Sequence, residues 1–129
     1  MRKSSIRLAY VAGAFLGLSG VIAGAMGAHA LKEVLEPQQL DSFETAVRFQ
    51  MYHALFLILL ASIQERVTGN ALRWITILTI AGVILFSGSI YLLVLTPLNL
   101  GLVTPLGGSV LIVAWAWLMV WGIRYQRAA

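Results

Sequence analysis

The chain has 129 residues, of which 60% are hydrophobic and only 11% are charged, and its formal net charge is +4. Because a soluble globular domain carries about 25% charged residues, this composition excludes an ordinary soluble domain and indicates an integral membrane protein. The absence of cysteine excludes disulfides, thiolate catalysis and cysteine-ligated metal clusters. The basic residues lie at the chain ends and in one connector, so we expect them to contact phospholipid and not nucleic acid.

Four apolar stretches predict an all-α membrane protein with a single domain, a four-transmembrane-helix bundle. The expected spans cover residues 8–30, 42–63, 74–95 and 102–123. The second span is the least obvious, because its purely apolar part is too short for a hydrocarbon core of about 30 Å. We therefore expect this helix to begin near Ser42, with Asp41 as its N-cap and Glu44 as the capping-box partner.

A cleavable secretory signal is an alternative interpretation of the first stretch. Arg2 and Lys3 precede it, and the residues at 28–30 have the A-x-A form of a cleavage site. However, the apolar run of about 21 residues is longer than the usual 7–15 of such signals. Cleavage would also remove the helix with the clearest packing pattern, so we expect this helix to be retained.

The distribution of charge predicts the orientation in the membrane. Seven basic residues fall on one side: Arg2, Lys3, Arg7, Arg66, Arg73, Arg124 and Arg127. The other side has two basic and four acidic residues: Lys32, Arg48, Glu33, Glu36, Asp41 and Glu44. The positive-inside rule then predicts that both termini are cytoplasmic. Trp117, Trp121 and Tyr125 recur every four residues, and we interpret them as an interfacial anchor belt and not as a cofactor site.

Glycines in the first span recur at alternating spacings of four and three residues, which keeps them on one helix face. They are Gly13, Gly17, Gly20, Gly24 and Gly27. In lipid, small residues let two helix backbones approach closely, so this face predicts a helix-packing surface. We favour packing within the chain, since three other helices must dock. A homo-oligomer or another membrane protein stays open as the partner.

Uncharged polar side chains gather in the predicted outer half of the bundle. This candidate polar pocket consists of His29, Gln50, Tyr52, His53, Ser87, Ser89, Tyr91 and Thr104. Polar groups in hydrocarbon need partners, so we expect these to point at one another. For the histidines we favour interhelical hydrogen bonds. The alternatives are a proton-responsive or ligand-binding pocket and a bis-histidine haem or metal site. No spacing motif supports the last, so we expect no cofactor and no metal.

Catalytic patterns are missing from the sequence. No carboxylate lies inside a predicted span, Ser87 and Ser89 lack a nucleophile-elbow motif, and Gly107-Gly108 has no basic neighbour that would make a phosphate loop. We therefore expect no catalytic residues and a non-enzymatic protein, structural or accessory, in membrane homeostasis. The alternative is a small transporter, channel or lipid- or quinone-binding protein that uses the outer polar pocket.

Four ordered motifs resemble a known family. They are G-A-M-G-A-H-A-L at 24–31, F-E-T-A-V-R-F-Q-M-Y-H-A-L at 43–55, F-S-G-S-I-Y at 86–91 and T-P-L-G-G at 104–108. They resemble the bacterial inner-membrane proteins classed as domain of unknown function 423, which include the YgdD-like and YwdK-like proteins; animal transmembrane protein 256 is similar. The resemblance covers almost the whole chain. It implies four spans, a retained first helix and a multi-pass protein of the inner (plasma) membrane, and it implies no particular activity. Ala114-Trp115 departs from the family's usual Gly-Trp, which puts close packing at that point in doubt.

Overall fold

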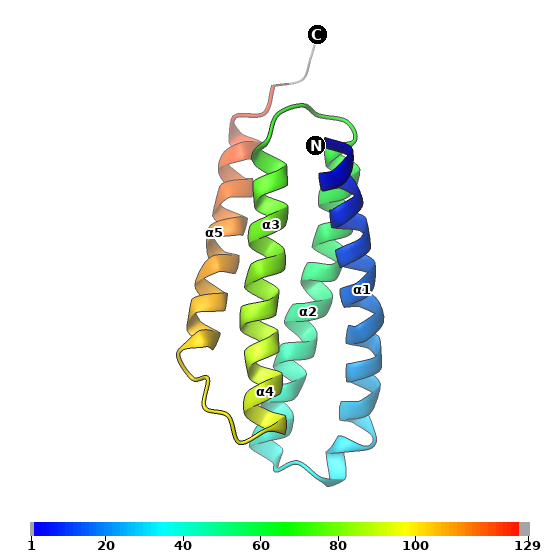
Figure 1. The fold of residues 1–129 in the computed structure, drawn as a ribbon, viewed down its shortest axis with the longest axis vertical. Helices are drawn as coiled ribbons and strands as arrows, with labels where there is room; N and C mark the ends of the chain where they lie inside the picture. The colour runs from blue at the N-terminus through cyan, green and yellow to red at the C-terminus, as the bar shows by residue number, and fades with distance from the viewer. Residues whose placement is uncertain (1, 127–129) are drawn as a thin grey trace.

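The computed structural model describes residues 2–126 as a bundle of four long helices (Figure 1). The elements in chain order are α1 (Arg2–Ala28), the 3-10 turn η1 (Leu31–Glu33), α2 (Pro37–Gln64), α3 (Ala71–Val83), the π-helical segment η2 (Ile84–Gly88), α4 (Ser89–Leu95) and α5 (Val103–Ile123). The segments α3, η2 and α4 form one continuous span. All four spans are long and apolar enough to cross a membrane, as the sequence predicts.

The helices run alternately up and down, which separates the connectors into two groups (Figure 1). The start of α1, the end of α5 and the α2–α3 connector share one end of the bundle, here called the termini end. The α1–α2 and α4–α5 connectors share the opposite end. Arg127, one of the basic residues counted above, lies outside the described residues.

Helix α2 begins earlier than the sequence analysis predicts. Its N-cap is Glu36, followed by Pro37 at the first helical position, and Gln39 completes a capping box with a 3.1 Å bond from the Glu36 amide to the Gln39 side chain. Proline at this position has its φ angle already set for a helix and lacks only an N–H that would be unpaired there anyway. The expectation that Asp41 is the cap was therefore wrong, and Asp41 lies inside the helix.

The glycine-rich face of α1 lies against α2 of the same chain. Three of its glycines are buried there: Gly13, Gly20 and Gly27. A Cβ added at Gly13 would lie 2.9 Å from the backbone oxygen of Ala54, so no other residue fits without displacement. Gly17 and Gly24 have more room, with the nearest α2 atoms 3.9 and 3.5 Å from an added Cβ. Packing on this face is therefore tight at some of the five positions and ordinary at others.

A second glycine contact joins α5 to the third span. A Cβ added at Gly107 would lie 2.3 Å from the backbone nitrogen of Phe86 in η2, and one added at Gly82 would lie 2.6 Å from the Leu111 side chain. The bundle thus consists of two close helix pairs, α1 with α2 and the third span with α5. Small residues allow each close approach.

The main hydrophobic core connects the two pairs. It consists of Phe56, Leu57, Leu60, Leu72, Ile75 and Ala114. Ala114 is 0% exposed, so alanine is accommodated at the position where the family's usual motif has glycine. Next to it, the ring of Trp115 stacks on Phe56 with centroids 4.1 Å apart. Large aromatic side chains therefore fill the space between α2 and α5.

Candidate functional site: a polar network beside a lateral pocket

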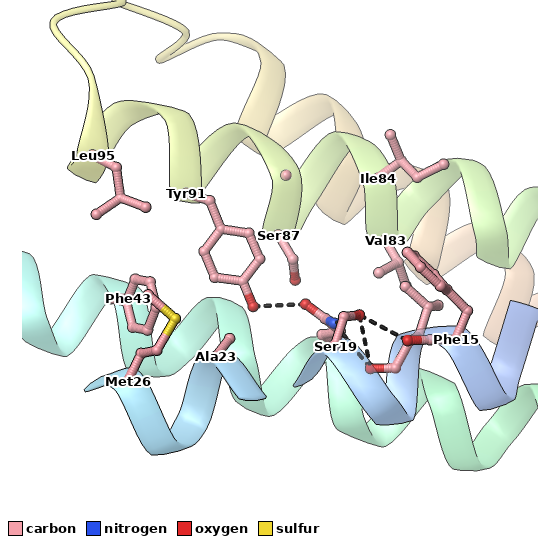
Figure 2. Close-up of a pocket in the computed structure, with 13 residues that line it drawn as sticks. Phe15, Ser19, Ala23, Met26, Phe43, Val83, Ile84, Ser87, Tyr91 and Leu95 are labelled. Carbon is pink, nitrogen blue, oxygen red and sulfur yellow. Dashed lines mark hydrogen bonds between the residues drawn. The ribbon is translucent and has the colours of Figure 1, made fainter. Parts of the chain in front are cut away.

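Gln50 on α2 links three helices through its side-chain amide. It is 5% exposed, and its Nε2 donates to Ser19 Oγ at 2.8 Å and to the Leu16 carbonyl at 2.9 Å, both on α1. Its Oε1 accepts a 2.6 Å bond from the Tyr91 hydroxyl on α4 (Figure 2). An amide carries both donors and acceptors, so one side chain holds two neighbouring helices in register.

His53 lies one helical turn further along α2 and has other partners. Its Nδ1 lies 2.6 Å from the Phe49 carbonyl, and its Nε2 lies 3.1 Å from the indole Nε1 of Trp115 on α5. A carbonyl only accepts and an indole N–H only donates, so this arrangement requires the neutral ring with its proton on Nδ1. Both ring nitrogens are engaged in these bonds, and coordination of a metal or haem iron would require breaking one of them.

The serines of the third span make two further contacts between helices. Ser87 in η2 is 1% exposed and donates to the Ala46 carbonyl of α2 at 2.8 Å. Ser89 and Thr104 share a 2.5 Å bond that joins α4 to α5. Ser87 lies in the π-helical segment and Ser89 directly follows it, and π-helical turns are frequent at functional sites.

Two residues of the predicted polar pocket make no hydrogen bond to the other six. His29 is exposed where α1 ends, and Tyr52 is 57% exposed on α2, with its ring 6.1 Å from that of Phe49. The remaining six residues occur in three separate groups: Gln50 with Tyr91 and Ser87 beside the pocket described next, His53 with Trp115, and Ser89 with Thr104. They do not form one site.

A pocket of about 460 Å³ lies between α1 and the third span, with α2 at its floor. We call it the lateral pocket. Figure 2 shows Phe15, Ser19 and Met26 of α1 on one side, and Ser87, Tyr91 and Leu95 on the other. The full lining is Phe15, Leu16, Ser19, Ala23, Met26, Phe43, Gln50, Val83, Ile84, Ser87, Gly88, Tyr91 and Leu95. His53, predicted from the sequence to share a pocket with Gln50, does not line it.

A second polar network, not predicted from the sequence, lies at the termini end. Gln64 is 5% exposed; its Oε1 accepts from Ser5 of α1 at 2.7 Å and its Nε2 donates to Thr76 of α3 at 3.1 Å. Arg2 donates to the Gln64 carbonyl at 2.9 Å. A signal was available, because Gln64 follows Gln50 by 14 residues, about four helical turns, and so lies on the same face of α2.

Within residues 2–126, every buried side-chain nitrogen or oxygen has a hydrogen-bond partner. In the same part of the chain, no three His, Asp or Glu side chains come together as a metal site requires. The buried polar side chains of the spans thus bond to one another and to the backbone. Their arrangement holds neighbouring helices in register, and the lateral pocket lies beside Gln50, Ser87 and Tyr91.

Comparison with known proteins gives a consistent result. Residues 23–108 match the family described as "Protein of unknown function (DUF423)". The chain is 38% identical over 116 residues to the UPF0382 membrane protein SAB0533 of Staphylococcus aureus (strain bovine RF122 / ET3-1), covering 89% of this chain and 94% of that one. It is 37% identical over 120 residues to the UPF0382 membrane protein YwdK of Bacillus subtilis (strain 168), covering 89% of this chain and 95% of that one.

It is also 34% identical over 117 residues to the UPF0382 inner membrane protein YgdD of Escherichia coli (strain K12), covering 88% of this chain and 89% of that one. No solved structure matches the chain. With four helices able to span a bilayer, the protein is a multi-pass protein of the bacterial inner membrane. The chain belongs to the DUF423 family, in agreement with the resemblance of its four motifs.

Proposed function

We propose that this protein is a non-enzymatic structural or accessory protein in membrane homeostasis. The observation that supports this proposal is the saturation of its buried polar groups: Gln50, His53 and Gln64 each bond to neighbouring helices. A catalytic group needs a free nucleophile or a base within reach of a substrate. Its partners under this proposal are the phospholipid bilayer and either another membrane protein or a second copy of the chain, and not nucleic acid.

The test measures stability and bound small molecules on the same purified samples. Gln50→Ala and His53→Ala should lower thermal stability, because each leaves polar groups on another helix unpaired. The parent protein should show no cofactor absorbance. A variant that keeps the parent's stability while losing a bound small molecule would contradict the structural role. Gln38→Ala, at an exposed position before the apolar part of α2, is the control.

Orientation is part of the same proposal: both termini lie in the cytoplasm. Among the described residues, the termini end carries six basic side chains and the carboxylate of Glu65, whereas the opposite end carries two basic and four acidic ones. The positive-inside rule favours the basic end in the cytoplasm. A reporter fused after Ala129 should score as cytoplasmic and one inserted at Gln38 as external. The reverse pattern would refute the orientation.

A second candidate function is the binding of a lipid or quinone tail in the lateral pocket. Its volume of about 460 Å³ falls within the range of about 300–1,000 Å³ that is common for ligand pockets. Its walls are largely aliphatic and aromatic, while Gln50, Tyr91 and Ser19 place polar atoms beside it (Figure 2). An elongated apolar molecule with one polar group matches this combination.

Gly88 allows the second candidate to be tested without disturbing helix packing. It lines the lateral pocket, and a Cβ added there would meet no atom within 4 Å. Gly88→Leu should therefore fill the pocket and abolish retention of a lipid or quinone through purification, as measured by mass spectrometry and absorbance. Gly122→Leu on α5 is the matched control, since its added Cβ is equally free. Equal retention by both variants would refute binding in this pocket.

A further inference from the structure

A second cavity, of about 290 Å³, lies at the termini end between the α2–α3 connector and the end of α5. We call it the basic pocket. From the connector it is lined by Arg66, Val67 and Thr68. From the other side it is lined by Trp121 of α5 and by Arg124, Tyr125 and Gln126, which follow the helix. The two arginines are far apart in the sequence, and the fold brings them to the same cavity.

Neither arginine of the basic pocket has a partner within the described chain, whereas two other arginines of the protein do. Arg2 donates to the carbonyls of Gln64 and Glu65, and Arg48 donates to Thr45. Among residues 2–126, neither the Arg66 nor the Arg124 guanidinium makes a hydrogen bond or an ion pair. Two guanidinium groups on one cavity raise the local positive potential, which an anion would relieve.

The nearest carboxylate in the sequence is directed elsewhere. Glu65 immediately precedes Arg66, but its Oε1 accepts a 3.2 Å bond from the Tyr10 hydroxyl on α1. Among the described residues, the lining of the basic pocket contains no acidic side chain. The cavity therefore offers cationic and neutral donors without an internal counter-charge.

The aromatic residues indicate which anion reaches this cavity. Trp121 packs partly against the hydrophobic core, and its ring lies 5.4 Å from that of Tyr125, which is 51% exposed. Helix α5 ends at Ile123, between these two rings in the sequence. Tryptophan and tyrosine concentrate at the headgroup level of a bilayer, where phosphodiester groups lie. The aromatic pair beside the two arginines therefore favours a lipid phosphate as the anion.

We propose that the basic pocket binds the phosphate group of an anionic phospholipid, with Arg66 and Arg124 as its two cationic contacts. Guanidinium groups suit this ligand because their planar N–H donors match two phosphate oxygens at once. Basic pockets between transmembrane helices on the cytoplasmic side bind lipid headgroups in the same way. This site is separate from the lateral pocket, and it goes beyond the structural role proposed above.

The experiment compares lipid binding by the full-length protein in detergent, using native mass spectrometry with added phosphatidylglycerol or phosphatidylethanolamine. The parent should retain phosphatidylglycerol preferentially. Arg66→Gln and Arg124→Gln should each weaken this binding about fivefold, and the double variant about twenty-five-fold. The matched control is Lys3→Gln with Arg7→Gln, which removes the same charge from exposed positions at the same end and should change binding little.

Several outcomes would overturn the proposal. One is an equal loss of phosphatidylglycerol binding in the Lys3→Gln/Arg7→Gln variant and in the Arg66→Gln/Arg124→Gln variant, because binding would then follow net charge alone. Another is equal retention of the two lipids by the parent. A third is displacement of phosphatidylglycerol by inorganic phosphate or glycerol 3-phosphate, which would identify a soluble anion as the ligand. Thermal stability is recorded for each variant, and the single variants decide the comparison if the double variant unfolds.

Discussion

Replacing Gly107 by alanine should destabilise the protein more than any other single added methyl group among its α5 glycines. A Cβ at this position would lie 2.3 Å from the backbone nitrogen of Phe86, 2.7 Å from the carbonyl carbon of Leu85 and 2.8 Å from the Phe86 Cα. All three are backbone atoms of η2, which no side-chain rotation can move. By contrast, a Cβ at Gly20 would meet the Met51 sulfur at 2.5 Å, and that flexible side chain can turn away.

The size of the effect follows from these distances. To restore an ordinary contact of 3.4 Å, α5 and η2 must separate by about 1.1 Å at this point. A gap of about 0.5–1 Å already removes a quarter to a half of the dispersion energy of each neighbouring contact. Overpacking costs about 1–3 kcal/mol, and a clash with fixed backbone atoms falls at the upper end of this range, above the gain of up to about 1 kcal/mol from replacing glycine inside a helix. We expect a net loss of about 2 kcal/mol.

Gly122→Ala is the matched control, because its added Cβ has no neighbour within 4 Å. It should be neutral or stabilising by up to about 1 kcal/mol, so the two variants should differ by about 2–3 kcal/mol in the free energy of unfolding. Equilibrium unfolding in mixed micelles with increasing dodecyl sulfate measures this difference. If Gly107→Ala proves as stable as Gly122→Ala, the close approach of α5 to η2 is refuted.

Further variants test the other contacts by the same unfolding measurement. Gln50→Ala should cost about 2 kcal/mol, since it removes three interhelical hydrogen bonds worth about 0.6 kcal/mol each, and an unchanged stability would refute its linking role. Trp115→Phe keeps an aromatic ring but removes the bond to His53, and should cost about 0.6–1.7 kcal/mol; full stability would argue against that bond. Gly13→Ala should be clearly destabilising whereas Gly17→Ala should be tolerated, because an added Cβ meets a backbone oxygen at 2.9 Å in the first and a methyl group at 3.9 Å in the second. Equal stability of these two would contradict the intrachain packing of α1 on α2.

The class of protein and the four spans follow from sequence alone because they depend on local composition. A run of about 20 apolar residues satisfies its backbone in lipid only as a helix, whatever its neighbours are. The glycine-rich face of α1 is also local, since spacing alone puts those residues on one side of a helix. The start of α2 could also have been predicted, because Pro37 and Gln39 carry the helix-start signal. The prediction of Asp41 as the N-cap did not take this signal into account.

Tertiary structure alone decided which faces meet. Gln50 and His53 share a face by their spacing, yet Gln50 bonds to α1 and α4 while His53 bonds to α5. The contact of Gly107 with η2 and the Gln64 network likewise join residues that are distant in sequence. Spacing along one helix shows which side chains point together. It does not fix the rotation and axial shift of each helix against its neighbours, because those are set by the packing of all four helices at once.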